Sequence, residues 1–150
     1  RRKNIIERFA KNGITQDRLI MKTSSSLGEY FKSYNLVDIA LSPFPYGGTT
    51  TSIDALWMGV PILVKKGDNF LSNIGESITN NAGLGNWMAN NDDEYIAKAV
   101  EFSRDINGLA KLRKNLRKQV LSSPLFDSPR FAVNFKNALW GMWDEREKKS

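Results

Sequence analysis

Apolar residues recur at two spacings along this chain, and the spacings predict helices that alternate with short strands. Helical periodicity covers residues 2–12, 27–35 and 50–58. Short, mostly apolar segments bounded by Gly, Pro or polar residues predict strands over 18–22, 37–42 and 61–64. Beyond about residue 70 the pattern is helical, with helices predicted over 70–80, 92–105, 108–121 and 129–147.

Helices alternating with buried strands indicate an α/β fold with a parallel sheet. A helical C-terminal region follows that sheet. No linker interrupts the pattern, so residues 1–150 are expected to form one domain. Parallel sheets bind ligands beyond the carboxyl ends of their strands. The loops at 23–26, 43–49 and 65–70 are therefore expected to share one rim.

Composition removes several kinds of chemistry. The chain has no cysteine and no histidine, which excludes disulfides, thiolate metal sites and Ser-His-Asp triads. The net charge is +6, but its late basic residues fall in a strongly helical stretch and are interpreted as a solvated face rather than a nucleic-acid surface. No apolar run is long enough for a membrane span. We expect no nucleic-acid or membrane partner and a cytoplasmic location.

The segment Gly47–Ser52, with the sequence GGTTTS, lies between a predicted strand and a predicted helix. Two glycines allow a tight turn and close approach to a ligand. The N–H groups and partial positive charge of a helix start suit a phosphate or diphosphate. Asp54 follows about one turn later and could accept hydrogen bonds from a ribose. By spacing alone, a simple helix cap explains the segment equally well; it matches neither a P-loop nor a G-x-G-x-x-G fingerprint.

The stretch from Phe44 to Pro61 (FPYGGTTTSIDALWMGVP) closely resembles the C-terminal domain of the O-linked N-acetylglucosamine transferases and of their bacterial relatives with TPR repeats. The likeness continues over most of the chain, through Gly83-Leu84, Asp93-Glu94-Tyr95, Leu112-Arg113, Ser122–Asp127 and Met142-Trp143.

This resemblance implies a GT-B fold with two Rossmann-like halves, of which residues 1–150 would belong to the C-terminal, nucleotide-sugar-binding half. It implies a UDP-sugar donor, no metal and no other cofactor, and it assigns no catalytic residue to this chain. The substrate-binding residues that it implies are Gly48, Thr49, Thr50 and Thr51 at the diphosphate, Asp54 at the ribose, and Ser25 and Tyr30 beside the uracil. Tyr30 could stack on the base or pack against its own sheet.

Three departures separate this sequence from the family pattern. Thr49 stands where many members have histidine, and Asn73 replaces a common arginine. The basic residue that members place near the donor phosphates would lie upstream of Arg1, together with the acceptor-binding half and any TPR repeats. We therefore expect the isolated chain to be inactive without its N-terminal partner domain.

The resemblance predicts transfer of N-acetylglucosamine to Ser or Thr of a protein acceptor. Two alternatives stay open: a related transferase that uses GDP-fucose or UDP-glucose, and a non-catalytic phosphate-binding or interaction module. The tryptophans are expected to pack in the core or between domains rather than stack on sugar; they are Trp57, Trp87, Trp140 and Trp143. The last helix is apolar on more than one face, which predicts self-association through Phe131, Phe135, Trp140 and Trp143.

Overall fold

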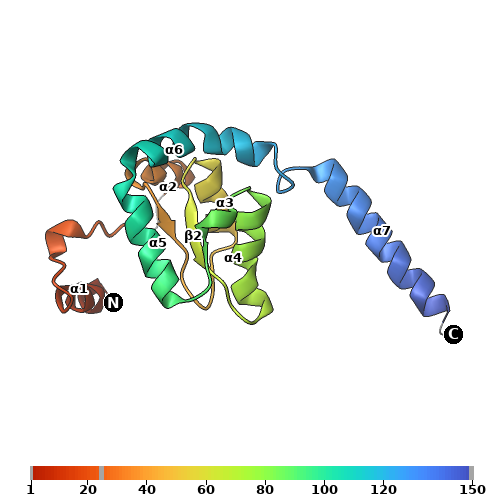
Figure 1. Ribbon diagram of the computed structural model, residues 1–150, viewed down its shortest axis with the longest axis horizontal. Coiled ribbons are helices and arrows are strands. Elements are labelled where there is room, and N and C mark those ends of the chain that lie inside the picture. The colour runs from red at the N-terminus through yellow and green to blue at the C-terminus, as the bar shows by residue number, and fades with distance from the viewer. Residues whose placement is uncertain (1, 24–25, 149–150) are drawn as a thin grey trace. The chain divides into compact units, whose positions relative to one another are not determined.

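The computed structural model describes residues 2–23 and 26–148 (Figure 1). These residues divide between Tyr30 and Phe31 into two compact units. The α-helices are α1 (Arg2–Ala10), α2 (Leu27–Ser33), α3 (Thr50–Trp57), α4 (Phe70–Asn81), α5 (Asp92–Arg104), α6 (Ile106–Leu121) and α7 (Ser128–Glu147). The strands are β1 (Ala40–Leu41), β2 (Ile62–Lys65) and β3 (Met88–Ala89), and the 3₁₀-helices are η1 (Gln16–Arg18), η2 (Tyr34–Leu36) and η3 (Gly85–Trp87).

In the second unit, the strands form a parallel sheet in the order β1-β2-β3. Ala40 pairs with Ile62 on one side of β2, and Val64 pairs with Met88 on the other. Helix α3 connects β1 to β2 and α4 connects β2 to β3, so the sheet consists of two consecutive βαβ units. Strand β2 lies between α5 and α4 in Figure 1 and contacts both. The predicted parallel α/β architecture with a helical C-terminal region is confirmed.

The core is built around β2 and the inner faces of α3, α4 and α6. Leu56, Leu63, Leu116 and Val120 are completely buried. The contact between α3 and α6 closes this core. Its members are apolar, and burial of such side chains contributes about 1.5–3 kcal/mol each relative to exposure.

The strand predicted over 37–42 is shorter in the structure, because the carbonyl of its first residue accepts a hydrogen bond from a side chain instead of from a neighbouring strand. The Arg113 guanidinium, on α6, donates hydrogen bonds to the carbonyl of Val37 and, at 2.8 Å, to that of Tyr34. Pairing with β2 begins only where the Ala40 N–H donates to the Pro61 carbonyl at 2.9 Å. Strand β3, which the sequence analysis did not predict, is two residues long and shows no periodicity that a pattern could detect.

The strand predicted over 18–22 is wrong. Gln16–Arg18 form η1, and the residues that follow have no regular structure. A strand needs a neighbour for its backbone N–H and C=O groups. None of the described residues pairs with this segment, and Ile20 is 74% exposed. Residues 18–22 have the polar ends and apolar centre that are typical of a strand, but this pattern does not supply the neighbouring strand that pairing requires.

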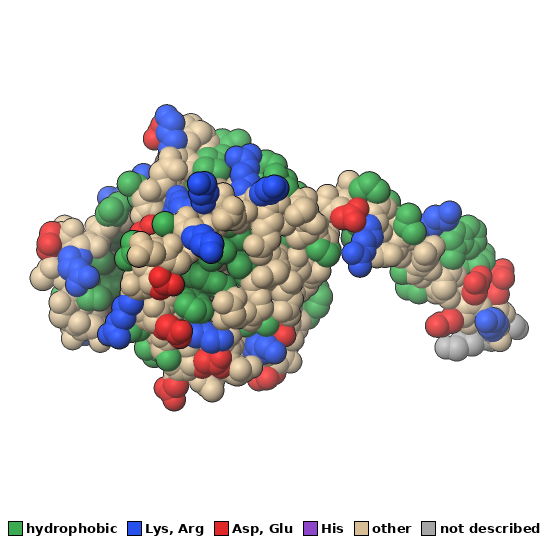
Figure 2. Space-filling view, turned by 45° about the horizontal axis from the view of Figure 1, so that its top comes forward, with side chains coloured by type: hydrophobic (Ala, Val, Ile, Leu, Met, Phe, Trp, Pro, Cys, Tyr) green, Lys and Arg blue, Asp and Glu red, His purple; other side chains and the backbone are tan. Residues whose placement is uncertain are grey.

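The predicted helices are confirmed to within a few residues. Helix α7, considered by itself, has no buried residue, and Figure 2 shows hydrophobic side chains along it. Phe131, Phe135, Trp140 and Trp143 are between 55% and 68% exposed. Trp87, in contrast, is buried and packs against Phe102, and Trp57 packs against Phe126. Self-association through α7 stays a prediction.

Two glycines with positive φ end helices of the core and allow a matched test of strain. Gly59 follows α3 at φ +79°, and a Cβ there would lie 3.0 Å from the Arg113 carbonyl oxygen. Gly83 follows α4 at φ +74°, but its Cβ would meet the flexible end of Gln119. Left-handed backbone costs an L-residue about 1–2 kcal/mol.

We expect Gly83→Ala to lower the free energy of unfolding by about 1–2 kcal/mol, the cost of the left-handed backbone alone. Gly59→Ala should lower it by about 2–4 kcal/mol, because a backbone carbonyl cannot move aside as a side chain can. Urea denaturation of both variants measures the difference. Equal losses would contradict the close packing of α3 on α6.

The start of α5 is held by Glu94. Its carboxylate accepts hydrogen bonds from the Asn90 backbone N–H and side chain, each at 2.8 Å, and pairs with Lys98 at 2.9 Å. The Asn90 N–H, then the Lys98 ammonium and the Asn90 amide, lower the pKa of Glu94 from 4.5 to about 2. A carboxyl whose pKa falls on folding stabilises the folded state above its unfolded pKa.

The contribution of Glu94 should therefore be present above about pH 4.5 and lost as the pH falls towards 2. Glu94→Gln should flatten the fall in unfolding free energy over that interval, as measured by denaturant titrations at successive pH values. Glu101→Gln, on the exposed surface of the same helix, is the control and should follow the parent chain. If Glu94→Gln also followed it, these contacts would not fix the start of α5.

Candidate functional site

Helix α3 begins at the carboxyl edge of the sheet, directly after the loop that leaves β1. Thr49 is its N-cap residue, with φ −87° and ψ −73°, and its side chain makes no capping hydrogen bond. The side chains of Thr49, Thr50 and Thr51 are exposed. The first N–H groups of a helix have no acceptor within the helix. The start of α3 therefore combines such backbone donors with the exposed hydroxyl groups of its threonines.

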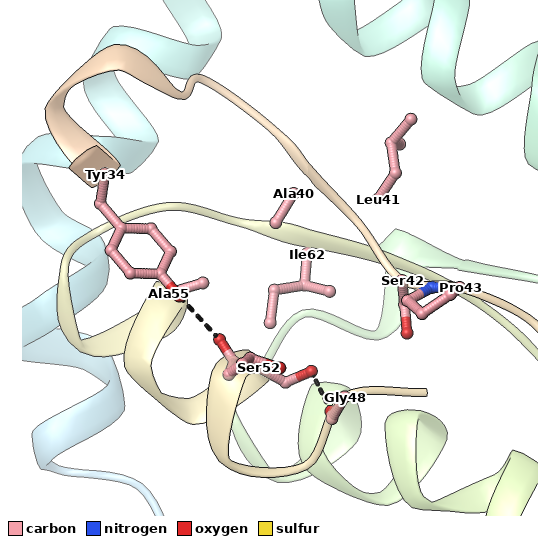
Figure 3. A pocket seen from close by; sticks show the side chains of 10 residues that line it. Tyr34, Ala40, Leu41, Ser42, Pro43, Gly48, Ser52, Ala55 and Ile62 are labelled. Carbon is pink, nitrogen blue, oxygen red and sulfur yellow. Dashed lines mark hydrogen bonds between the residues drawn. The ribbon is translucent and has the colours of Figure 1, made fainter. Parts of the chain in front are cut away.

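Two contacts fix the first turn of α3 without using those donors. The hydroxyl of Ser52, a buried residue, donates to the Gly48 carbonyl. The Tyr34 hydroxyl donates to the Thr51 carbonyl at 3.3 Å. Both hydrogen bonds are visible in Figure 3. Both of these contacts hold the turn through its carbonyls and engage none of its N–H groups.

A cavity of about 190 Å³ lies beside this turn (Figure 3). It is lined by the end of β1, by Gly48 and by the first turns of α3, with Tyr34 at one side. Gly48 contributes by its lack of a side chain, since a Cβ there would lie 2.1 Å from the Thr51 Oγ1. A side chain at position 48 would therefore collide with the first turn of α3 itself, and the predicted close approach of this backbone to a ligand stays a prediction.

Asp54 is half-buried, in the middle of α3. It lies four positions after Thr50 and three after Thr51, and this spacing places all three side chains on neighbouring parts of one helix face. The structure therefore brings together Gly48, Thr49, Thr50, Thr51 and Asp54 as the sequence predicted. Their role in substrate binding stays a prediction.

The predicted uracil-binding residues belong to the other part of the chain. Tyr30 is half-buried on α2, and its backbone N–H donates to the Ser26 carbonyl at 3.0 Å. Ser25 lies outside the described residues. Two of the three loops predicted to share a rim, 43–49 and 65–70, follow neighbouring parallel strands of one sheet and so lie at the same edge.

Other polar contacts at this rim were not predicted. The Tyr95 hydroxyl, from α5, donates to the Ser42 carbonyl at 3.1 Å, and burial raises the pKa of Tyr95. The Lys65 ammonium lies 2.6 Å from Asp92 Oδ1 and 3.6 Å from the centre of the Phe44 ring. No local motif marks these residues, because each contact joins distant parts of the sequence.

Asn73, the second departure from the family pattern, lies in α4 near this rim. Its Oδ1 accepts a hydrogen bond of 3.4 Å from the Gly67 N–H, in the loop after β2. Asn73 therefore shapes the loop and adds no charge to it.

Among residues 2–23 and 26–148, no three His, Cys, Asp or Glu side chains gather as a metal site would require. The expectation that no metal is needed stays a prediction from the resemblance. Within the same residues no helix combines the length and hydrophobicity of a membrane span.

Comparison with known proteins places this geometry in a family. The model described as "Glycosyl transferase family 41" matches residues 2–135. The probable UDP-N-acetylglucosamine–peptide N-acetylglucosaminyltransferase SPINDLY of Arabidopsis thaliana is 40% identical over 115 residues, which are 77% of this chain and 13% of that protein. The corresponding enzyme SEC of the same plant is 31% identical over 136 residues, 90% of this chain and 14% of that protein.

A solved structure of a mutant O-GlcNAc transferase from Thermobaculum terrenum has a TM-score of 0.87 and 31% identity. The match covers 95% of this chain and 28% of that chain. The fold is therefore that of an α/β domain from a GT-B-type O-GlcNAc transferase, as the resemblance implied. Because the family model matches nearly the whole sequence, the chain belongs to glycosyl transferase family 41. It spans only about one seventh of the length of the two curated relatives.

Gly48 provides a test of the turn itself. Gly48→Ala should displace the Thr51 hydroxyl and lower the unfolding free energy by about 1 kcal/mol, the cost of an off-rotamer side chain. Removing the colliding atom in Gly48→Ala/Thr51→Ala should recover most of that loss. Thermal or urea unfolding of both variants is the measurement, with Gly141→Ala, where a Cβ meets nothing within 4 Å, as the control. A double variant no more stable than Gly48→Ala would show that the collision is not the cause.

Proposed function

We propose that this chain is the donor-binding portion of a glycosyltransferase that takes N-acetylglucosamine from its UDP-sugar and transfers it to Ser or Thr of a protein. Two lines of support converge. The relatives' names specify UDP-N-acetylglucosamine and peptide N-acetylglucosaminyl transfer. The chain itself carries an exposed Thr-rich helix start at the carboxyl edge of a parallel sheet, where such folds bind nucleotides.

The exposed start of α3 is the observation that carries the proposal. Its unpaired N–H groups and the helix dipole, equivalent to about half a positive charge, favour a diphosphate. The hydroxyls of Thr49, Thr50 and Thr51 add donors around the same point. Asp54, further along the face, accepts hydrogen bonds from the ribose hydroxyls. The nucleotide would then run along α3 from its tip towards Asp54.

The chemical work of this half-site is electrostatic. In the transfer, the bond between the sugar's anomeric carbon and the β-phosphate oxygen breaks, a bond from that carbon to the acceptor hydroxyl oxygen forms, and the proton of the hydroxyl passes to solvent. UDP leaves with increased negative charge on its terminal phosphate. Fixed N–H donors at the α3 tip stabilise that charge as it develops, and they need no reorganisation to do so.

The rest of the enzyme supplies what this portion lacks. We propose that the chain alone binds UDP but transfers no sugar, because the acceptor and the phosphate-facing cation of the family pattern come from other parts of the enzyme. The TPR repeats, the protein acceptor, the cytoplasmic location and the place of Tyr30 beside the uracil remain predictions. The curated relatives favour UDP-N-acetylglucosamine over GDP-fucose or UDP-glucose, and competition among these three donors tests that choice.

Asp54→Ala should weaken UDP binding by about 1.5–3 kcal/mol, the range for a hydrogen bond to a charged group. It should leave inorganic phosphate almost unaffected, because the carboxylate faces the ribose rather than the helix tip. Thr50→Ala should weaken both ligands by about 1 kcal/mol, since the backbone donors survive. Isothermal titration calorimetry with UDP and with phosphate measures both effects.

Asp144→Ala, which removes an exposed carboxylate from α7, is the matched control and should bind UDP like the parent chain. Circular dichroism confirms that each variant is folded. UDP affinity that is insensitive to Asp54→Ala would refute the ribose assignment, and the Thr-rich segment would then be only a helix start.

A further inference from the structure

Lys65 occupies the carboxyl end of β2, the central strand of the sheet. Its backbone is paired with Ala89 of β3, and the N–H of the next residue donates to the Ala89 carbonyl at 2.9 Å. The side chain is only 15% exposed. A lysine ammonium at such a position needs partners that replace water, and the stem that carries it starts from a fixed strand.

The partners come from two other segments of the rim. The ammonium lies 3.6 Å from the centre of the Phe44 ring, in the loop between β1 and α3. It also lies 2.6 Å from Oδ1 of Asp92, the first residue of α5. A cation over an aromatic face is attracted by the ring quadrupole, most strongly where water is excluded. Lys65 thus joins the β1–α3 loop to the sheet and to α5.

Phe44 is enclosed further by the loop after β2. A Cβ on Gly67 would lie 3.1 Å from Cε2 of the Phe44 ring, so the backbone of Gly67 passes close to the ring. Phe44 is nevertheless 49% exposed. Such a partly exposed ring is held by its specific neighbours rather than by burial in the core.

The β1–α3 loop is tied at three points. Tyr95 binds the Ser42 carbonyl before Phe44, and Ser52 binds the Gly48 carbonyl after it. Lys65 holds Phe44 between them. The N–H groups proposed to bind diphosphate follow directly after the last of these points, so their direction depends on the course of this loop.

We propose that Lys65 is a positioning residue for the diphosphate site: its ammonium clamps Phe44 and thereby holds the loop that aims the N–H groups of Thr49–Thr51. This inference rests on the proposed function of α3. Lys65 acts through Phe44 and does not contact the donor, because its ammonium is already engaged by the ring and by Asp92. Asp92, at 81% exposed, orients the ammonium from the solvent side.

The neighbouring residue provides a matched control. Lys66 carries the same charge one position later, is 40% exposed, and pairs with Glu76 at 3.0 Å. Lys66→Met therefore removes one positive charge from the same loop without touching Phe44. Lys65→Met keeps the length of the stem and removes the cation, and Phe44→Leu keeps an apolar side chain and removes the ring face.

The test is a double-mutant cycle read by UDP affinity. Lys65→Met and Phe44→Leu should each weaken UDP about fivefold, a loss of the size expected for one cation–π contact. Combining them should weaken UDP no further, since either change alone releases the loop. Lys66→Met should stay within about twofold of the parent chain, because a general charge effect is small at a screened surface.

Two results would overturn the clamp. Lys65→Met could lose the same affinity in the Phe44→Leu background as in the parent chain, which would indicate direct contact of Lys65 with phosphate. Alternatively, Lys65→Met could lower the unfolding free energy while UDP affinity stays unchanged, which would indicate a structural role alone. Phe44→Leu, at a half-exposed position, carries the test if Lys65→Met does not fold.

Amide hydrogen exchange separates this proposal from the one on which it rests. Lys65→Met should accelerate exchange in the segment Gly48–Thr51 without any ligand, whereas Lys66→Met should not. If UDP did not bind the parent chain, or Asp54→Ala did not weaken it, the proposed function would fail while exchange still reported on the clamp. Unchanged exchange with normal, Asp54-dependent UDP binding would refute the clamp alone.

Discussion

Strand β2 has no face towards water over its first three residues: Ile62, Leu63 and Val64 are each at most 2% exposed. Strand β1 pairs with its first two residues on one edge, β3 pairs with its last two on the other, and helices pack against it. Polar chemistry can therefore appear only where the strands end. The start of α3 and the side chain of Lys65 both lie at that carboxyl edge, so the buried strand determines where a ligand can meet the sheet.

Much of this arrangement could be predicted from the sequence because it depends on local signals. The apolar run around Leu63 and the GGTTTS turn each act over a few residues. The strand expected over 18–22 shows the limit of such signals. An apolar segment with polar ends can be a strand only if another segment pairs with it, and the pattern does not reveal that partner.

The candidate site divides in the same way. Gly48 and the three threonines could be placed at a helix start from their order alone. The resemblance to a family then implied which ligand this helix start would bind. The supports behind it could not be found in the same manner. Tyr95 reaches Ser42 across 53 positions and Lys65 reaches Asp92 across 27, so only the folded sheet brings them together.

The proposed function depends on the N–H groups at the start of α3, which we propose to bind the diphosphate of a uridine nucleotide. Backbone amide chemical shifts of the ¹⁵N-labelled chain, titrated in parallel with UDP and with uridine, test it most directly. We expect UDP to shift the amides of Gly48–Thr51 most strongly and uridine, which lacks the diphosphate, to leave them nearly unchanged. Shifts by UDP mainly at the amides that begin α4 or α5, or shifts of the α3 amides by uridine as large as those by UDP, would contradict diphosphate binding at the start of α3.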